Sequence, residues 1–254
     1  AGFDAPLKGQ TFSIKLVYRP GLNEKYQFRD LARQVINHWQ TNCPEYDPYL
    51  PEIVSTYEPA EEVKQACKAL KYRNRPVLVI YPGSSRNATF RRWDWKNYQQ
   101  IILKFQDSWE VVIAGGPDEQ DISITVAKEG LKTHNWIKRW ALLDWAWFFH
   151  NEKPCLIGND GGLLHVAEAV RLPVIGIFGP SRFSKWGSIN PESIAFETDV
   201  DCRPCLRNYL GDVPQRCWKG TSECLTRIPA NVVIDAIEQS INRTRRVTDV
   251  GKAS

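Results

Sequence analysis

The feature that most constrains the fold is a regular alternation, from residue 75 onward, of short apolar runs with stretches whose apolar residues recur at helical spacing. Strands of a parallel sheet alternate with crossover helices in this way. The predicted strands are 76–81, 109–115, 135–138, 154–158 and 172–179. The predicted helices are about 94–106, 118–129, 141–150, 162–170 and, after Pro229, 229–243. We therefore expect an α/β domain over 73–245.

The first 72 residues follow a different pattern and predict a separate N-terminal region with a linker. A β-rich run at 11–18 precedes a helix with apolar residues at helical spacing over 25–40. Residues 41–59 contain four prolines and little periodicity, which is typical of an interdomain linker, and a helix is predicted at 60–70. We interpret 246–254 as a tail.

Composition excludes several classes of protein. The chain has 254 residues, of which 43% are hydrophobic and 24% charged, so it is ordinary globular material. It contains no run of eighteen apolar residues and does not begin like a signal peptide, so we expect a cytoplasmic location. The net charge of +4 gives little support to nucleic-acid binding. The absence of methionine suggests that the chain begins after a processing or cleavage point.

Ligands of an open α/β sheet bind at the carboxyl ends of the strands, so the turns after the apolar runs are the candidate site. The run at 154–158 is followed by "NDGGLLH". Gly161 and Gly162 there permit positive φ and close approach of a ligand, and the following helix N-terminus attracts an anion such as a diphosphate. Asp160 suits sugar hydroxyls, and His165 suits a phosphate or hydroxyl. Alternatively, the segment is an Asx turn that caps a helix, with the histidine packed beneath it.

Two other turns carry polar residues that suit a nucleotide. Ser84 and Ser85 offer hydroxyl groups, and Arg91 and Arg92 offer cations, a set that suits a diphosphate leaving group, although a solvated basic loop would contain the same residues. Glu119 could bind a ribose, or could simply be an acid favoured in the first turn of a helix. Trp140, which follows the third predicted strand, could line an adenine pocket. The glycine patterns of dinucleotide-binding, P-loop and hydrolase enzymes are absent from the sequence.

Four segments in this order resemble glycosyltransferase family 9, the heptosyltransferases. They are "YPGSSRNATFRRWDWKNYQQI", "VVIAGGPDEQ", "CLIGNDGGLLHVAEAVRLPVIGIFGPS" and "CLTRIPANVVIDAIEQ", and they cover about 75–243. The resemblance implies a GT-B fold, with a Rossmann-like C-terminal domain that binds the nucleotide sugar and an N-terminal domain that binds the acceptor. Residues 1–72 would then be a remnant of the acceptor side.

The resemblance also implies roles for individual residues. Ser84, Ser85 and Arg91 would hold the diphosphate, with Arg91 in place of the family's usual lysine. The Asp-x-Gly-x-x-His element falls on Asp160, Gly162 and His165, which would read the donor sugar and its phosphates.

Glu119 matches an acid that meets the ribose. In this family a carboxylate near the start of the protein is expected to deprotonate the acceptor hydroxyl. We therefore expect the base to precede Ala1, and we do not assign it to Asp4, which precedes the first predicted strand.

Four of the seven cysteines are clustered in a polar, Gly- and Pro-rich segment, as C-x2-C-x11-C-x6-C at Cys202, Cys205, Cys217 and Cys224. Such a set of thiolates suits a tetrahedral structural metal, zinc or iron, although reduced or opportunistically paired thiols would give the same pattern. A four-cysteine finger resembles the autotransporter heptosyltransferase branch, which implies iron, a ring-shaped oligomer and transfer to protein serines.

The leading hypothesis is therefore transfer of a heptose from ADP-heptose to an acceptor hydroxyl, with a protein serine of an autotransporter adhesin favoured. One alternative is a heptosyltransferase that acts on lipopolysaccharide core. Another is a non-enzymatic binding module in which the metal finger is the working part. The finger mixes acidic with basic residues, which argues against a nucleic-acid partner and favours a structural or assembly role.

Overall fold

The computed structural model describes residues 2–4, 15–38, 49, 52–207, 211 and 213–250. Its main feature is a six-stranded, fully parallel sheet in the order β5-β4-β3-β6-β7-β8. The strands are β3 (Val77–Tyr81), β4 (Glu110–Ile113), β5 (His134–Asn135), β6 (Cys155–Asn159), β7 (Val174–Ile177) and β8 (Ile194–Phe196). Within the described ranges, no helix has both the length and the apolarity needed to cross a membrane.

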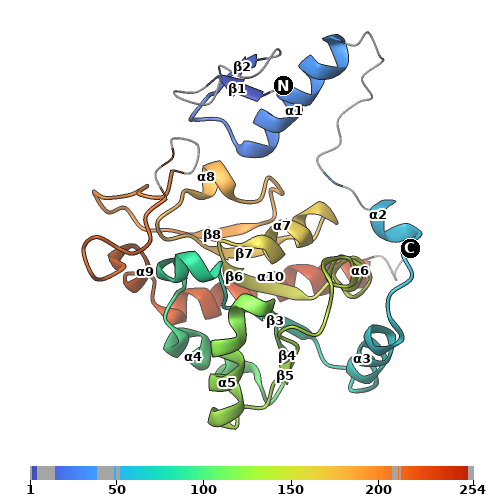
Figure 1. Cartoon of the computed structure of the whole chain (residues 1–254). Helices are drawn as coiled ribbons and strands as arrows, with labels where there is room; N and C mark the ends of the chain where they lie inside the picture. The colour runs from blue at the N-terminus through green and yellow to red at the C-terminus, as the bar shows by residue number, and fades with distance from the viewer. Residues whose placement is uncertain are drawn as a thin grey trace.

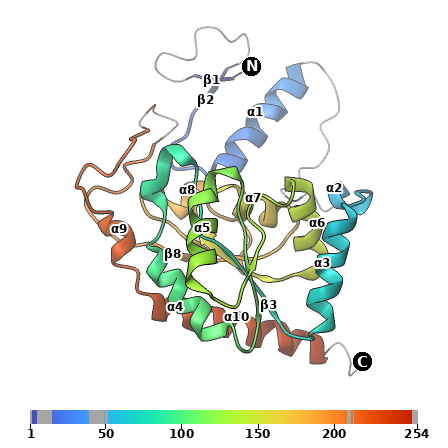
Figure 2. The ribbon, with the colours of Figure 1, turned by 60° about the horizontal axis from the view of Figure 1, so that its bottom comes forward.

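Helices cover both faces of the sheet. They are α3 (Glu61–Tyr72), α4 (Trp95–Phe105), α5 (Gln120–Glu129), α6 (Leu142–Glu152), α7 (Gly162–Ala169) and α10 (Ala230–Val250), with the short helices η2 (Arg86–Arg91), η3 (Pro117–Glu119), α8 (Phe183–Trp186) and α9 (Glu223–Thr226). Helices α4, α5 and α10 lie on one side of the sheet and α3, α6 and α7 on the other (Figures 1 and 2). The buried side chains of each group belong to a separate hydrophobic cluster.

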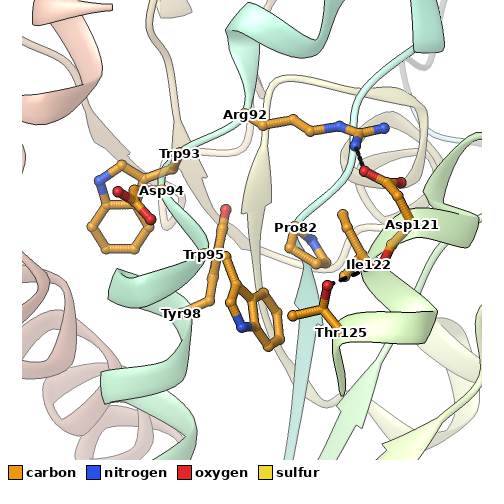
Figure 3. A pocket seen from close by; sticks show the side chains of 9 residues that line it. All are labelled: Pro82, Arg92, Trp93, Asp94, Trp95, Tyr98, Asp121, Ile122 and Thr125. Carbon is orange, nitrogen blue, oxygen red and sulfur yellow. Dashed lines mark hydrogen bonds and ion pairs between the residues drawn. The ribbon is translucent and has the colours of Figure 1, made fainter. Parts of the chain in front are cut away.

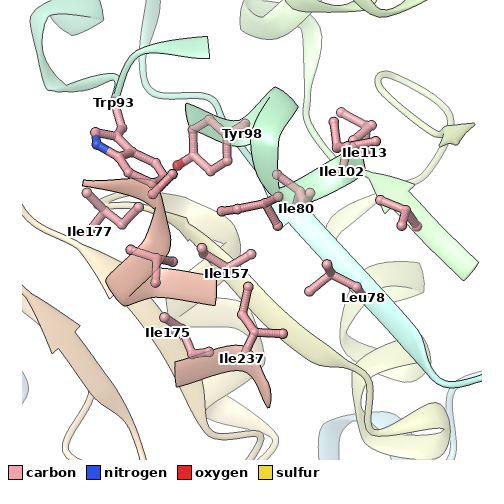
Figure 4. Packing of buried hydrophobic residues seen from close by; sticks show 14 of the residues in the cluster. Leu78, Ile80, Trp93, Tyr98, Ile102, Ile113, Ile157, Ile175, Ile177 and Ile237 are labelled. Atoms are coloured by element: carbon pink, nitrogen blue, oxygen red, sulfur yellow. The ribbon is translucent and has the colours of Figure 1, made fainter. Parts of the chain in front are cut away.

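The division into two faces follows from the alternation of side chains along each strand. Leu78 and Ile80 of β3 face α4 and α10, whereas Val79 between them belongs to the opposite cluster (Figure 4). Strands buried on both sides read as continuous apolar runs, which is why the sequence shows them so clearly. The helices end where local chemistry stops them: Asp94 caps α4 by accepting from the Lys96 amide, and Gly130 ends α5 at a φ of 62°.

The N-terminal residues form a small parallel sheet and a long helix. Strands β1 (Gly2–Asp4) and β2 (Lys15–Val17) pair in parallel, and α1 (Glu24–His38) follows. Figure 1 shows this part beyond α8. Helix α1 contacts α8 through an ion pair of Glu24 with Lys185 and α7 through an ion pair of Lys25 with Glu168, and Glu24, Lys185 and Glu168 are all buried.

The structure corrects several boundaries predicted from the sequence. Asp4 lies within a strand and does not precede the first one. The short helix α2 (Glu52–Ser55) interrupts the predicted linker, and α10 continues to Val250, so the first part of the predicted tail is helical. The third predicted strand, 135–138, overlaps the two-residue strand β5 (His134–Asn135) only at Asn135. Strand β8 and helix α8 have no counterpart among the predicted elements. Most of 41–51, with Cys43, lies outside the described residues.

Candidate donor site at the switch point of the sheet

The candidate site lies where the strand order of the sheet reverses. Strands β3 and β6 are neighbours, although β4 and β5 follow β3 on one side and β7 and β8 follow β6 on the other. Connections that leave two adjacent parallel strands in opposite directions open a crevice at their carboxyl ends, and ligands of α/β proteins bind there. The turns that begin at Pro82 and Asn159 border this crevice, so the two segments singled out in the sequence are brought together.

Asn159 joins the two turns and is not among the site residues predicted from the sequence. Its side chain is fully buried, and both atoms of its amide group form hydrogen bonds. The amide nitrogen donates to the carbonyls of Pro82 (2.7 Å) and Gly83 (3.2 Å), and the oxygen accepts from the Trp93 amide (3.0 Å) and the Tyr98 hydroxyl (2.9 Å). This network fixes the spacing between the carboxyl ends of β3 and β6.

Asp160 is the central acid of the site and is buried. One of its oxygens accepts a short hydrogen bond from the Ser181 hydroxyl, and the same oxygen lies 3.4 Å from Arg91 Nη1. The sequence assigns no role to Ser181, although it stands in the polar turn after the fifth predicted strand. Among the described residues we find no partner of the other carboxylate oxygen, so that oxygen is available for a ligand hydroxyl.

The two glycines after Asp160 differ in the space around them. A Cβ on Gly161 would lie 2.7 Å from the Tyr81 ring, so this position needs a residue without a side chain. A Cβ on Gly162 would meet nothing within 4 Å, which leaves open space at the start of α7. The expected positive φ is wrong for both residues, because Gly161 is extended (φ −176°) and Gly162 is helical. The N-cap residue of α7, Gly161, has no side chain to cap the helix, so the N-terminal amides can bind an anion.

His165 lies one turn further along α7 and is half-buried. No hydrogen bond or ion pair of its ring is found among the described residues, so the imidazole is available to a ligand. Burial lowers its pKa below the usual 6.5, and the nearby positive charge of Lys25 acts in the same direction. An anionic ligand beside the ring would reverse that shift.

The turn after β3 places its two serines differently. The Ser84 hydroxyl is fully buried and donates to the Ala88 carbonyl (3.0 Å), because the short helix η2 folds the chain back over it. Ser85 is exposed. In this arrangement Ser85 can donate its hydroxyl to a ligand, whereas Ser84 stabilises the turn. Arg92 is also held in place, since it donates to the carbonyls of Ser84 and Asp118.

Glu119 is buried and packs against the glycines of two turns. Its carboxylate accepts from the Gly116 amide at 2.6 Å, and its side chain occupies the space where Gly83 would carry a Cβ. Burial raises its pKa above the usual 4.5. Glu119 therefore joins the β3 and β4 turns, and contact with a ribose requires its side chain to turn outward.

A cavity of about 340 Å³ lies beside the crevice, between the starts of α4 and α5 (Figure 3). Arg92 and Asp121 form an ion pair at its rim, at 2.6 Å. Arg92 thus lines this cavity, whereas Ser84, Ser85, Arg91 and the other predicted donor-binding residues do not. Trp140 also lies apart from it: its ring packs 4.3 Å from that of Trp136, and its buried indole nitrogen has no acceptor among the described residues.

The four clustered cysteines are all free thiols. Burial raises the pKa of Cys224 to about 11, and the other three thiols act in the same direction, so each of them lies within electrostatic range of Cys224. The arrangement differs from a metal site in one respect. In the part of the chain that the structure describes, no three His, Cys, Asp or Glu side chains are placed to hold a metal ion.

Comparison with known proteins agrees with this geometry. The family model of glycosyltransferase family 9 (heptosyltransferase) matches residues 24–210, so the match begins in α1 and not at residue 75 as the motifs indicate. Lipooligosaccharide heptosyltransferase 2 of Campylobacter jejuni is 25% identical over 167 residues, which are 59% of this chain and 51% of that protein. The chain thus spans about half the length of this curated relative.

Two solved structures illustrate the shared fold. The ADP-heptose heptosyltransferase II of Escherichia coli superposes with a TM-score of 0.59 and 16% identity, over 82% of this chain and 57% of that one. The dodecameric iron-containing heptosyltransferase TibC, in complex with ADP-D-β-D-heptose, gives 0.52 and 15%, over 85% and 55%. The α/β, GT-B-type fold expected from the sequence is confirmed. With a family model that matches most of its length, the chain belongs to glycosyltransferase family 9, the heptosyltransferases.

Proposed function

We propose that this chain binds ADP-heptose in the crevice between β3 and β6 and serves heptose transfer to an acceptor hydroxyl. The observation that carries the proposal is Asp160, held by Ser181 and Arg91 beside the uncapped N-terminus of α7. A carboxylate with a free oxygen suits sugar hydroxyls, while the helix N-terminus suits the adjacent diphosphate. The names of the similar proteins support heptose as the sugar.

In the proposed reaction, an acceptor oxygen attacks the anomeric carbon, the bond from that carbon to the phosphate oxygen breaks, and ADP leaves. Arg91 and the N-terminal amides of α7 stabilise the charge that develops on the leaving diphosphate. Ser85 adds a hydroxyl donor, and His165 donates to a phosphate or a sugar hydroxyl. The acceptor proton passes to a base that we assign to no residue of this chain. In the same scheme, 73–245 is the donor domain and 1–72 belongs to the acceptor side.

The acceptor that we favour is a protein serine of an autotransporter adhesin, and the support is the four-cysteine segment. A lipopolysaccharide core is the alternative, since the curated relatives act on lipooligosaccharide or lipopolysaccharide by name. Transfer of labelled heptose to an adhesin fragment, with core-truncated lipopolysaccharide as the competing acceptor, separates the two. Label that appears only in lipopolysaccharide would refute the protein acceptor.

We further propose a structural metal, iron or zinc, held by Cys202, Cys205, Cys217 and Cys224. Cys202, Cys205 and Cys217 all lie close enough to Cys224 to raise its pKa, so the four thiols are a soft donor set that a cation would stabilise as thiolates. The metal would cross-link a polar segment that is rich in glycine and proline. Elemental analysis of protein purified without chelators should give about one metal per chain. Cys217→Ser should remove it, and wild-type protein without metal would refute the site.

An oligomer and a cytoplasmic location complete the proposal. The heptosyltransferase TibC, which this chain resembles in fold, is dodecameric, and the nucleotide sugars that such enzymes use suggest a cytoplasmic site of action. Light scattering that gives a mass of one chain, about 29.2 kDa, would refute the oligomer.

Donor binding is tested by titrating the purified chain with ADP-heptose, ADP and UDP-N-acetylglucosamine while following tryptophan fluorescence. We expect ADP-heptose to bind more tightly than ADP and UDP-N-acetylglucosamine to bind least. Equal affinity for both sugar nucleotides would refute the assignment of the donor.

A further inference from the structure

The base of the cysteine segment is tied to the candidate donor site through Arg203. This residue stands between Cys202 and Cys205 and is buried. Its guanidinium donates to the carbonyls of Gly179 (2.5 Å) and Ser181 (2.7 Å) in the turn after β7. The same group donates to the Thr198 carbonyl and pairs with Glu197 at 2.5 Å.

The backbone of the cysteine segment completes the connection. The amides of Cys205 and Leu206 both donate to the Pro180 carbonyl, at 3.1 and 3.2 Å. Three consecutive carbonyls, those of Gly179, Pro180 and Ser181, therefore accept from the base of the segment. The Ser181 hydroxyl in turn donates to Asp160.

The hydrogen bonds of Arg203 restrict the position of the turn after β7 in addition to satisfying the buried guanidinium. A guanidinium is a rigid planar fork, so two of its nitrogens on the carbonyls of Gly179 and Ser181 fix the direction of the turn as well as its distance. The Ser181 carbonyl and hydroxyl belong to one residue, and holding the first restricts where the second can lie. A lysine would supply the charge without the fork.

We propose that Arg203 is a positioning residue for the donor site: through Ser181 it holds Asp160 in the orientation that reads the sugar. The cysteine segment and the donor crevice then behave as one unit, and a change in the segment alters the selectivity for the sugar. The proposal rests on the proposed function, because it assigns the reading of the sugar to Asp160.

A double-mutant cycle tests this proposal, with Arg203→Ala, Ser181→Ala and the double variant. The readout is the ratio of the affinity for ADP-heptose to that for ADP, because ADP lacks the sugar that Asp160 reads. We expect each single variant to lower the ratio on the order of tenfold, and the double variant to lower it no further. Arg227→Ala is the matched control, because Arg227 directly follows the segment and pairs with Glu223 of the segment at the surface.

Effects of Arg203 and Ser181 that multiply in the double variant, or a ratio that Arg203→Ala leaves unchanged, would overturn the proposal. A general loss of stability would lower both affinities together and leave the ratio intact. If Arg203→Ala does not fold, Arg203→Lys takes its place, and we expect a smaller fall in the same direction.

Hydrogen exchange of the free protein separates this proposal from the proposed function. We expect Arg203→Lys to speed exchange in 178–187 and at the start of α7, with β3 unchanged. Faster exchange confined to 198–207 would overturn the coupling even if ADP-heptose binds. A wild-type chain that binds no nucleotide, together with the expected exchange pattern, would refute the donor site and leave the mechanical connection standing.

Discussion

Replacement of Asn159 by alanine tests whether the crevice is held at its base by one side chain. Four buried groups depend on this residue: the Trp93 amide, the Tyr98 hydroxyl and the carbonyls of Pro82 and Gly83. Asn159→Ala removes all four bonds at once. Tyr98→Phe removes only one of them and serves as the matched control.

The expected loss of stability follows from the cost of unpaired buried groups. A buried donor or acceptor without a partner costs about 1–3 kcal/mol, with carbonyls at the lower end because they tolerate incomplete bonding. Two donors and two carbonyls would then cost more than about 4 kcal/mol, and a water molecule that enters the vacated space recovers part of it, which leaves about 3–5 kcal/mol. Tyr98→Phe should cost about 1 kcal/mol, the net value of one hydrogen bond.

Urea unfolding measures the difference. With a slope of about 3 kcal/mol per molar urea, Asn159→Ala should lower the midpoint by about 1–1.7 M and Tyr98→Phe by about 0.3 M. A midpoint for Asn159→Ala within about 0.3 M of that for Tyr98→Phe would refute the reasoning, because it would mean that the three additional bonds together contribute no more than about 1 kcal/mol.

Two further predictions concern α7. The pKa of His165 in the folded protein lies below its usual 6.5, so the unfolded chain binds a proton first as the pH falls, and the free energy of unfolding decreases below about pH 6.5. In thermal melts from pH 8 to 5, His165→Gln should remove this part of the decrease. A difference in melting temperature between variant and wild type that stays constant over this range would contradict the direction of the pKa shift. Gly161→Ala should lower the free energy of unfolding, measured in urea, by about 1–3 kcal/mol because its Cβ meets the Tyr81 ring. Gly162→Ala should change that free energy by no more than about 0.5 kcal/mol, yet it should weaken donor binding because it narrows the open space at the start of α7. Equal stability of the two variants would be evidence against this distinction.

The sheet can be predicted from the sequence because its strands are buried on both faces. Their apolar runs and the helical periodicity between them depend only on local sequence, so the predicted positions of β3, β4, β6 and β7 agree with the structure to within a few residues. Strand β8 escapes prediction because its three residues, Ile194–Phe196, form too short a run to stand out from a loop. The N-terminal strand β1 is equally short.

The candidate site can be predicted only in part, because it depends on contacts between residues that are far apart in the sequence. Asp160 and the glycines follow a visible strand, but their partners are distant in sequence. Ser181 lies 21 residues from Asp160, and Asn159 bonds to Pro82, 77 residues away. Ser84 illustrates the opposite case. A hydroxyl in a polar turn suggests a hydrogen-bond donor that can reach a ligand, yet η2 folds back over Ser84, and the hydroxyl donates to the Ala88 carbonyl instead.

The most direct test of the account is a titration of Asp160→Asn, which keeps the shape of the side chain but removes its charge, with ADP-heptose and with ADP. If Asp160 reads the sugar, the variant that stays folded should bind ADP-heptose at least about tenfold more weakly, while its affinity for ADP changes by less than about threefold. Undiminished affinity for ADP-heptose in the folded variant would contradict the central claim that this carboxylate is the sugar-reading group of the donor site.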